Sequence, residues 1–197
     1  MGLYAGHFDF SQKLLWTVPG LLSPDECRAI LDGLAGETWL PATVNAEEGR
    51  VVDAKIRDNT VAVLRDPGLA DDLFRRARPH VPERMIVEHG GAGLVALELA
   101  GVHVPVRVYR YSPGQHFGLH QDQSYFRGDG ARSLLTFMVY LNEDFEGGET
   151  EFPEQERTIV PRTGEALFFQ HMLLHAGARV LRGTKLVLRS DVLYKAP

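Results

Sequence analysis

The sequence predicts a mainly β protein with flanking helices, an α+β arrangement in which helices support one side of a β-sandwich or barrel. Helical patterns are confined to the first half, whereas the second half consists of short β-rich segments separated by turns containing glycine and proline. The 197 residues contain no internal repeat and no proline- or serine-rich linker. We therefore expect one domain over 1–197, with supporting helices and strands in 1–100 and the β core in 101–197.

Two helices are expected in the first half of the chain. SPDE, at 23–26, has the pattern of a capping box with proline at the first helical position, which predicts a helix over 24–34. A second helix is expected over 69–78, where apolar residues recur at helical spacing on one face. The remaining elements expected there are strands at 14–18 and within 39–65, the latter around a polar loop at 45–58.

The second half shows the alternation and turn signals of strands. Gly147-Gly148 is a good tight turn and predicts a hairpin. The expected strands are 102–111, 133–141, 150–152, 166–170 and 185–194.

Composition and charge narrow the classes of partner. A formal net charge of -5 gives no electrostatic reason to expect nucleic acid or an anionic membrane as a partner. Cys27 is the single cysteine, so an internal disulfide is impossible and a reducing compartment is expected. The N-terminus lacks a secretory pattern, and no apolar stretch approaches the ~20 residues that span a bilayer. We expect a cytoplasmic monomer or homodimer.

The segment GLHQDQSY, at 118–125, brings His120 and Asp122 two residues apart. On an extended segment, residues i and i+2 project to the same face, so an imidazole and a carboxylate can converge on one ion. Two histidines and one carboxylate with open positions are typical of non-haem Fe(II). The downstream candidates for the second histidine are His171 and His175. Cys27 lies far upstream, which argues against a zinc site with a cysteine ligand.

A cation is expected to face this site from the strand KLVLRSDVLY. Alternation places Lys185, Val187, Arg189 and Asp191 on one face of that strand. A dicarboxylate co-substrate that chelated the metal with one end would need such a cation for its far carboxylate.

These residues together resemble the Fe(II)- and 2-oxoglutarate-dependent dioxygenases, specifically the prolyl 4-hydroxylase-like branch. The pattern Tyr-x-x-Gly-x-x-aromatic-x-x-His-x-Asp is matched by Tyr111, Gly114, Phe117, His120 and Asp122. RSLLTFMVYLN, GGETEFP, VPRTGEALFF and HAGARVLRGTK then follow in the order of the family. The resemblance covers about 107–194 and implies a double-stranded β-helix core, also called a jelly-roll or cupin-like core.

The resemblance also implies roles for individual residues. His120, Asp122 and His175 would be the iron ligands and hence the catalytic residues, and His171 is interpreted as a pocket-edge or surface histidine. Phe117 departs from the pattern, because prolyl hydroxylases usually have tyrosine there. Arg189 would compete for the co-substrate or bind a substrate carboxylate. The residues implied for 2-oxoglutarate are Lys185 as the ion-pair partner, then Tyr111, Tyr140 and Thr136.

The implied activity is hydroxylation of an unactivated C–H bond, with O2 consumed and 2-oxoglutarate converted to succinate and CO2. Ascorbate is a candidate stimulant. The implied substrate is a prolyl residue in a peptide or protein, and a small molecule or free amino acid is the alternative. Polar and cationic residues in the 45–58 and 123–131 loops suggest a polar or anionic substrate, with these substrate candidates: Arg50, Lys55, Arg57, Tyr125 and Arg127.

Two other functions are weighed against this one. A non-catalytic iron or 2-oxoglutarate sensor is disfavoured by the complete ligand set. A cupin-like protein that binds zinc or manganese would be expected to carry a His-x-His pair with a glutamate, which the His-x-Asp of this chain does not match.

Overall fold

Two capped helices form in the first half of the chain. The computed structural model describes residues 8–46, 49–88 and 93–197. Helix α1 (Pro24–Asp32) begins at the predicted capping box, in which Ser23 and Glu26 bond each other's backbone N–H. Helix α2 (Pro67–Ala77) starts two residues before the expected helix, because the Asp66 side chain caps it. The N-terminal residues 1–7, and 47–48 of the polar loop, lie outside the described residues.

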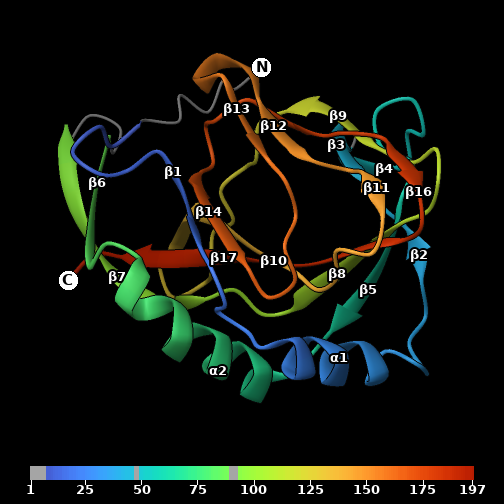
Figure 1. Cartoon of the computed structure of the whole chain (residues 1–197). Coiled ribbons are helices and arrows are strands. Elements are labelled where there is room, and N and C mark those ends of the chain that lie inside the picture. The colour runs from blue at the N-terminus through green and yellow to red at the C-terminus, as the bar shows by residue number, and fades with distance from the viewer. Residues whose placement is uncertain (1–7, 47–48, 89–92) are drawn as a thin grey trace.

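A large antiparallel sheet lies at the centre of the molecule (Figure 1). Its strands run in the order β1-β14-β10-β17-β8-β5-β2, while β7 pairs with β17 and β6 pairs with β7. The bounds are β1 (Leu15–Val18), β2 (Leu40–Pro41), β5 (Thr60–Leu64), β6 (Arg84–Glu88), β7 (Leu94–Val102), β8 (Val106–Tyr111), β10 (Arg132–Tyr140), β14 (Ala166–Gln170) and β17 (Lys185–Lys195).

A smaller sheet, in the order β13-β12-β15-β9, lies on the side of the large sheet away from the helices (Figure 1). The β3-β4 hairpin and the two-stranded pair β11-β16 complete the described strands, and short 3-10 helices follow α2 and β12. The bounds are β3 (Val44–Ala46), β4 (Gly49–Val51), β9 (Phe117–His120), β11 (Glu146–Gly147), β12 (Thr150–Phe152), β13 (Arg157–Ile159), β15 (His175–Gly177), β16 (Val180–Arg182), η1 (Arg78–His80) and η3 (Pro153–Gln155).

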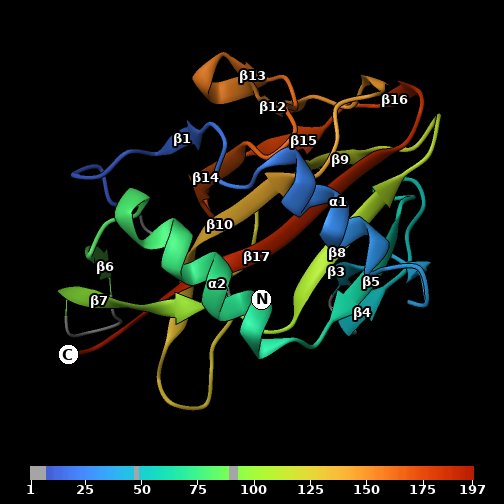
Figure 2. The same cartoon turned by 60° about the horizontal axis from the view of Figure 1, so that its bottom comes forward.

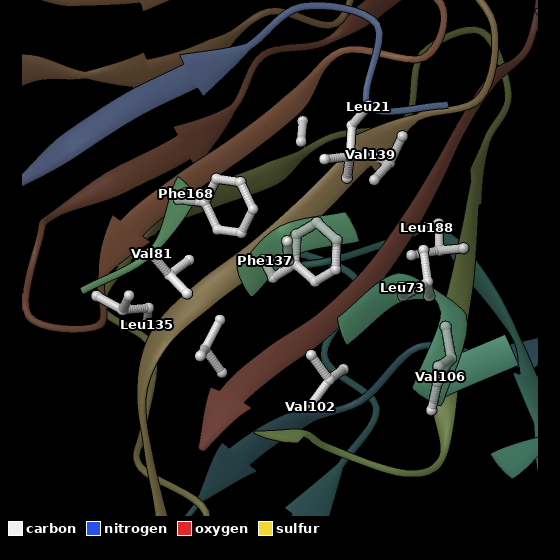
Figure 3. Close-up of a cluster of buried hydrophobic side chains, with 14 of the residues drawn as sticks. Leu21, Leu73, Val81, Val102, Val106, Leu135, Phe137, Val139, Phe168 and Leu188 are labelled. Atoms are coloured by element: carbon white, nitrogen blue, oxygen red, sulfur yellow. The ribbon is translucent and has the colours of Figure 1, made fainter. Parts of the chain in front are cut away.

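The hydrophobic core lies between the helices and the large sheet. Both helices pack across the face formed by β10, β17 and β8 (Figure 2). Leu135, Phe137 and Val139 of β10 point into this core, where Leu73 of α2 joins them (Figure 3). Alternation sends the intervening residues of the same strands to the opposite face, toward the small sheet. The mainly β fold with flanking helices and a jelly-roll core is therefore confirmed.

The strands of the structure differ from the expected ones in several places. Of the strand expected at 102–111, the structure keeps β8 from Val106 onward, whereas β7 overlaps the expected range only at Val102. Both pair with β17, β7 at 192–195 and β8 at 185–189, so the chain leaves the sheet and rejoins it along the same neighbour. The strands β6, β7, β9, β11, β13, β15 and β16 were not expected. The tight hairpin expected at Gly147-Gly148 does not form, because Gly147 lies in β11, which pairs with β16, while β12 pairs with β13 and β15.

The first hundred residues also contribute strands to the central sheet itself. β1 pairs with β14, and β5 pairs with β8. That 1–197 form one domain, divided into a supporting part and a β core at 100/101, stays a prediction. Neither α-helix in the described part of the chain has the length and apolar character needed to cross a bilayer.

Candidate metal centre

The small sheet brings the two histidines of the predicted triad side by side. His120 is the last residue of β9 and His175 the first of β15, and the two pair across the strands. Asp122 follows two residues later, where its backbone N–H donates to the His171 carbonyl at 3.0 Å. Pairing between strands therefore joins residues that lie 55 positions apart in the sequence.

The side chains of these three residues converge on one point. Nε2 of His120 lies 3.8 Å from Oδ1 of Asp122, and Nε2 of His175 lies 3.7 Å from Oδ2. The three candidate ligand atoms all lie within 4.8 Å of one another. This donor set, two imidazole nitrogens and one carboxylate facing a cavity, fits non-haem Fe(II).

Hydrogen bonds orient both histidine rings for ligation. Nδ1 of His120 contacts the Gly118 carbonyl at 2.8 Å, and Nδ1 of His175 contacts the Leu173 carbonyl at 2.9 Å. A carbonyl only accepts, so each Nδ1 carries the proton and each Nε2 presents a lone pair. Burial, followed by the neighbouring His175, lowers the pKa of His120 to about 3. Burial likewise lowers the pKa of His175. Both rings are therefore neutral at pH 7, as metal ligation requires.

The Asp122 carboxylate is buried and anionic. Its Oδ1 lies 2.9 Å from the Arg189 guanidinium, and its Oδ2 accepts a hydrogen bond from the Thr136 hydroxyl at 2.5 Å. Burial acts to raise the pKa of Asp122, but Arg189 and the histidines outweigh it and lower that pKa far below its usual range. The negative charge is thus retained without a metal.

A chain of buried hydrogen bonds continues from Asp122 through Thr136 to the outer loop. Thr136 Oγ1 lies 2.9 Å from Nδ1 of His171, and Nε2 of His171 lies 2.8 Å from Ser133 Oγ. Since the Thr136 hydroxyl donates to a carboxylate, it accepts from Nδ1–H of His171. Nε2 of His171 then accepts from Ser133, whose oxygen also accepts the Tyr125 backbone N–H at 2.8 Å. All the donors point one way, from Tyr125 to Asp122.

His171 is therefore an interior residue, not the surface or pocket-edge histidine that was expected. Its side chain is 4% exposed, and burial lowers the pKa of its ring, which stays neutral as the hydrogen-bond chain requires. The buried, hydrogen-bonded position of His171 could not be predicted from the residues near it in the sequence, because its partners Thr136 and Ser133 belong to the distant strand β10.

A cavity opens beside the three candidate ligands and contains Lys185 in its wall. The Lys185 ammonium is 2% exposed, donates to the Gly148 carbonyl at 2.5 Å and lies 5.3 Å from the centre of the Tyr111 ring. Burial lowers the pKa of Lys185 to about 8. The lining residues are Arg57, Tyr109, Tyr111, Phe117, His120, Asp122, Met138, Thr150, His175, Gly177, Lys185, Val187 and Arg189.

The residues predicted for the co-substrate take different places around this cavity. Tyr111 and Arg189 line it together with Lys185. The Tyr140 hydroxyl is bonded to Thr150 Oγ1 at 2.8 Å, and Thr150 is the member of that pair that lines the cavity. The Thr136 hydroxyl is directed at Asp122, as described above.

An outer groove adjoins the cavity, and three of the five substrate candidates line it: Arg50, Arg57 and Tyr125. Arg57 is buried, with its guanidinium 4.2 Å from the ring centres of both Tyr109 and Phe117. Tyr125 is 41% exposed and packs on His103. Arg127 is bonded to Asp129 through two contacts of 2.8 Å and is absent from the described lining of both hollows.

Other residues of the site were not foreseen from sequence, among them Tyr109, Met138 and Arg107. Tyr109 and Met138 line the cavity, and Arg107 lines the outer groove. Strand alternation supplies a signal for two of them, because Tyr109 and Arg107 share one face of β8 with Tyr111.

Comparisons with known proteins agree with this geometry. Residues 106–190 match the 2OG-Fe(II) oxygenase superfamily. Prolyl 4-hydroxylase 1 of Arabidopsis thaliana is 31% identical over 193 residues, which cover 83% of this chain and 63% of that protein. The chain spans only 36% to 63% of the length of several such curated relatives.

Solved structures share the fold. A viral collagen prolyl hydroxylase from Paramecium Bursaria Chlorella virus-1, in its 2OG complex, gives a TM-score of 0.63 at 23% identity and covers 93% of this chain and 97% of its own. A Pseudomonas putida prolyl-4-hydroxylase gives a TM-score of 0.64 at 18% identity, with 96% of each chain covered.

Proposed function

Because the chain belongs to the 2OG-Fe(II) oxygenase superfamily, we propose that it is a 2-oxoglutarate-dependent hydroxylase whose Fe(II) is held by His120, Asp122 and His175. The observation that carries the proposal is the convergence of the three donors beside a cavity whose wall contains a buried lysine. Bound Fe(II) would activate O2. The reaction would oxidise 2-oxoglutarate to succinate and CO2 and, coupled to that oxidation, hydroxylate a C–H bond of the substrate.

The protein contributes binding and orientation to this reaction. Lys185 is proposed to pair with the far carboxylate of 2-oxoglutarate, since a buried ammonium in the cavity wall binds an anion strongly. Tyr111, buried in the same wall, is proposed to add a hydroxyl hydrogen bond. Val187 and Met138 supply an apolar surface that excludes water from the co-substrate.

The proposed substrate is a prolyl residue in a peptide or protein. The support comes from the names of the relatives, which are prolyl 4-hydroxylases, and from an outer groove that leads from the candidate metal centre to solvent. The relatives give no support to the sensor alternative.

The decisive experiment is anaerobic reconstitution with Fe(II) and 2-oxoglutarate, followed by exposure to oxygen. We expect a visible charge-transfer band before oxygen is admitted, and succinate afterwards, with turnover raised by a prolyl peptide. His175→Ala should abolish the band, while Lys185→Ala should weaken 2-oxoglutarate binding strongly. A band that persists in His175→Ala would contradict the ligand assignment, and weakening confined to Arg189→Ala would move the anchor to Arg189.

A further inference from the structure

The outer groove carries an excess of positive charge. Residues from the β3-β4 hairpin, the β7-β8 segment, β9 and the 121–125 segment line it. Its charged side chains, apart from histidine, are Arg50, Arg57, Arg107, Arg189, Asp122 and Asp191.

Most of these charges are already engaged with protein groups. Arg189 contacts both aspartates, Asp122 at 2.9 Å and Asp191 at 3.3 Å. Arg57 is held between two aromatic rings, and its Nε donates to Asn59 at 2.8 Å. The two remaining arginines, Arg50 and Arg107, therefore have no counter-charge within the groove.

Arg107 is placed to meet a ligand. It lies on β8 opposite Arg189 of β17, on the face that also carries Tyr109. Its side chain is half-buried, and within the described part of the chain no acceptor bonds it. A partly shielded guanidinium without an acceptor can bind the carboxylate of a ligand with two N–H groups.

The charges of these arginines also shift the pKa values of two neighbouring side chains in the groove. Complete burial should raise the pKa of the Tyr109 phenol, yet the charges of Arg57, Arg189 and Arg107 outweigh burial and lower it. Burial lowers the pKa of His103, and Arg107 is among the cations that lower it further against the opposing charge of Asp191. The neighbourhood thus favours an added negative charge.

We propose that the groove recognises an acidic peptide, in which a carboxylate side chain near the hydroxylated residue binds Arg107, with the exposed Arg50 adding to the attraction. The groove suits a chain rather than a compact molecule, because it reaches from the metal centre past the exposed side chains of Ile56 and Leu119. This substrate class rests on the proposed hydroxylase function.

The test compares peptides that differ by a single charge. N-acetylated, C-amidated peptides with one proline carry Glu at each flanking position in turn, and a matched set carries Gln. Binding is measured by calorimetry to protein loaded anaerobically with Fe(II) and 2-oxoglutarate. At one position or more, Glu should bind about 10- to 100-fold more tightly than Gln in the unmodified protein, as expected for a charge-assisted bond.

Variants locate the effect. Arg107→Gln should reduce the preference for Glu to within about twofold, whereas Arg107→Lys should retain much of it because the charge remains. Arg84→Gln is the matched control, since it removes the same charge from an exposed ion pair between Arg84 of β6 and Glu98 of β7. These strands lie at the end of the molecule opposite β3 and β4 (Figure 1). Arg84→Gln should leave the preference intact.

Each alternative outcome has a distinct meaning. Equal binding of Glu and Gln peptides, or a preference that survives Arg107→Gln, overturns the inference. The inference is also overturned if Arg107 makes free proline bind more tightly than prolinamide but has no effect on the binding of Glu peptides. The carboxylate that Arg107 recognises would then be the α-carboxylate of a free amino acid. A normal charge-transfer band in those cases leaves the hydroxylase function standing. A missing band in the unmodified protein contradicts that function itself.

Discussion

Asp122 is held on both of its carboxylate oxygens before any metal binds. Arg189 contacts Oδ1 and the Thr136 hydroxyl contacts Oδ2, while His171 and Ser133 extend the second contact to the Tyr125 backbone. Partners of this kind fix the orientation of a metal ligand. They also join a wall of the outer groove to the candidate metal centre.

Thr136→Val removes one hydroxyl from this chain while keeping the shape of the side chain. We expect affinity for Co(II) or Ni(II), measured by competition titration, to fall about 10- to 100-fold, as for other partners of metal ligands. Thr136→Ser, which keeps the hydroxyl, should restore most of the affinity. Equal affinities for the valine variant and the unmodified protein would show that Asp122 needs no support from Thr136.

The proposed ion pair between Lys185 and 2-oxoglutarate should depend on pH. Burial lowers the pKa of its ammonium from 10.5 to about 8, with the charge of Glu149 opposing part of that shift. Only the protonated form attracts a carboxylate, so the dissociation constant should be constant below pH 8 and rise above it, by up to about tenfold per pH unit. The charge-transfer band, titrated with 2-oxoglutarate between about pH 7 and pH 9, measures this. In Lys185→Arg the cation never deprotonates, and the rise should vanish.

Prediction from sequence succeeded where neighbouring residues share a strand. Alternation alone placed Lys185 and Arg189 on one face, and both line the cavity. The partners of His171 were out of reach, because they are set by packing between β10 and the turn before β15. The same limit applies to Tyr140, whose hydroxyl meets Thr150 from another strand.

At the scale of elements, the turn before β14 packs closely against the segment that leads into α1. Gly164, in the turn before β14, adopts φ +78°, and a Cβ placed there would lie 1.9 Å from the Leu22 carbonyl oxygen. Its own carbonyl accepts the Leu22 N–H at 3.2 Å, and its N–H bonds the Tyr140 carbonyl at 2.8 Å. The turn thus fixes the start of α1 against the end of β10.

Gly164→Ala should consequently destabilise the protein by at least about 2 kcal/mol, from the left-handed backbone and the clash together. Gly20→Ala is the control, because Gly20 has a similar φ of +64° but open space around it. Gly20→Ala should lower the free energy of unfolding by about 1 kcal/mol. Urea unfolding measures both, and equal destabilisation by the two variants would show that the clash is relieved by movement of the turn.

The capping residues of α1 could be read from the sequence, whereas the strands β9 and β15 could not. SPDE gave the correct start of α1 because its hydrogen bonds are local. β9 and β15 have four and three residues, too few for a pattern to stand out, and they exist because they pair with each other and with the small sheet. They nevertheless position both histidines of the candidate metal centre.

For the whole molecule, the candidate site joins the two sheets. The histidines come from the small sheet, whereas Lys185 and Arg189 come from β17 of the large sheet. Ligands bound between them should stabilise the folded state, because the unfolded chain does not hold these groups together. A ligand at one hundred times its dissociation constant contributes about 2.7 kcal/mol.

That contribution should raise the melting temperature by about 5–10 °C for a chain of this length, in scans with Ni(II) and 2-oxoglutarate. Lys185→Ala should keep the shift from the metal and lose most of the further shift from 2-oxoglutarate, while His175→Ala should lose both. A further shift from 2-oxoglutarate that survives in Lys185→Ala would place the co-substrate elsewhere. His175 lies on the small sheet and Lys185 on the large sheet. The two variants therefore distinguish a loss of metal binding at the small sheet from a loss of 2-oxoglutarate binding at the large sheet.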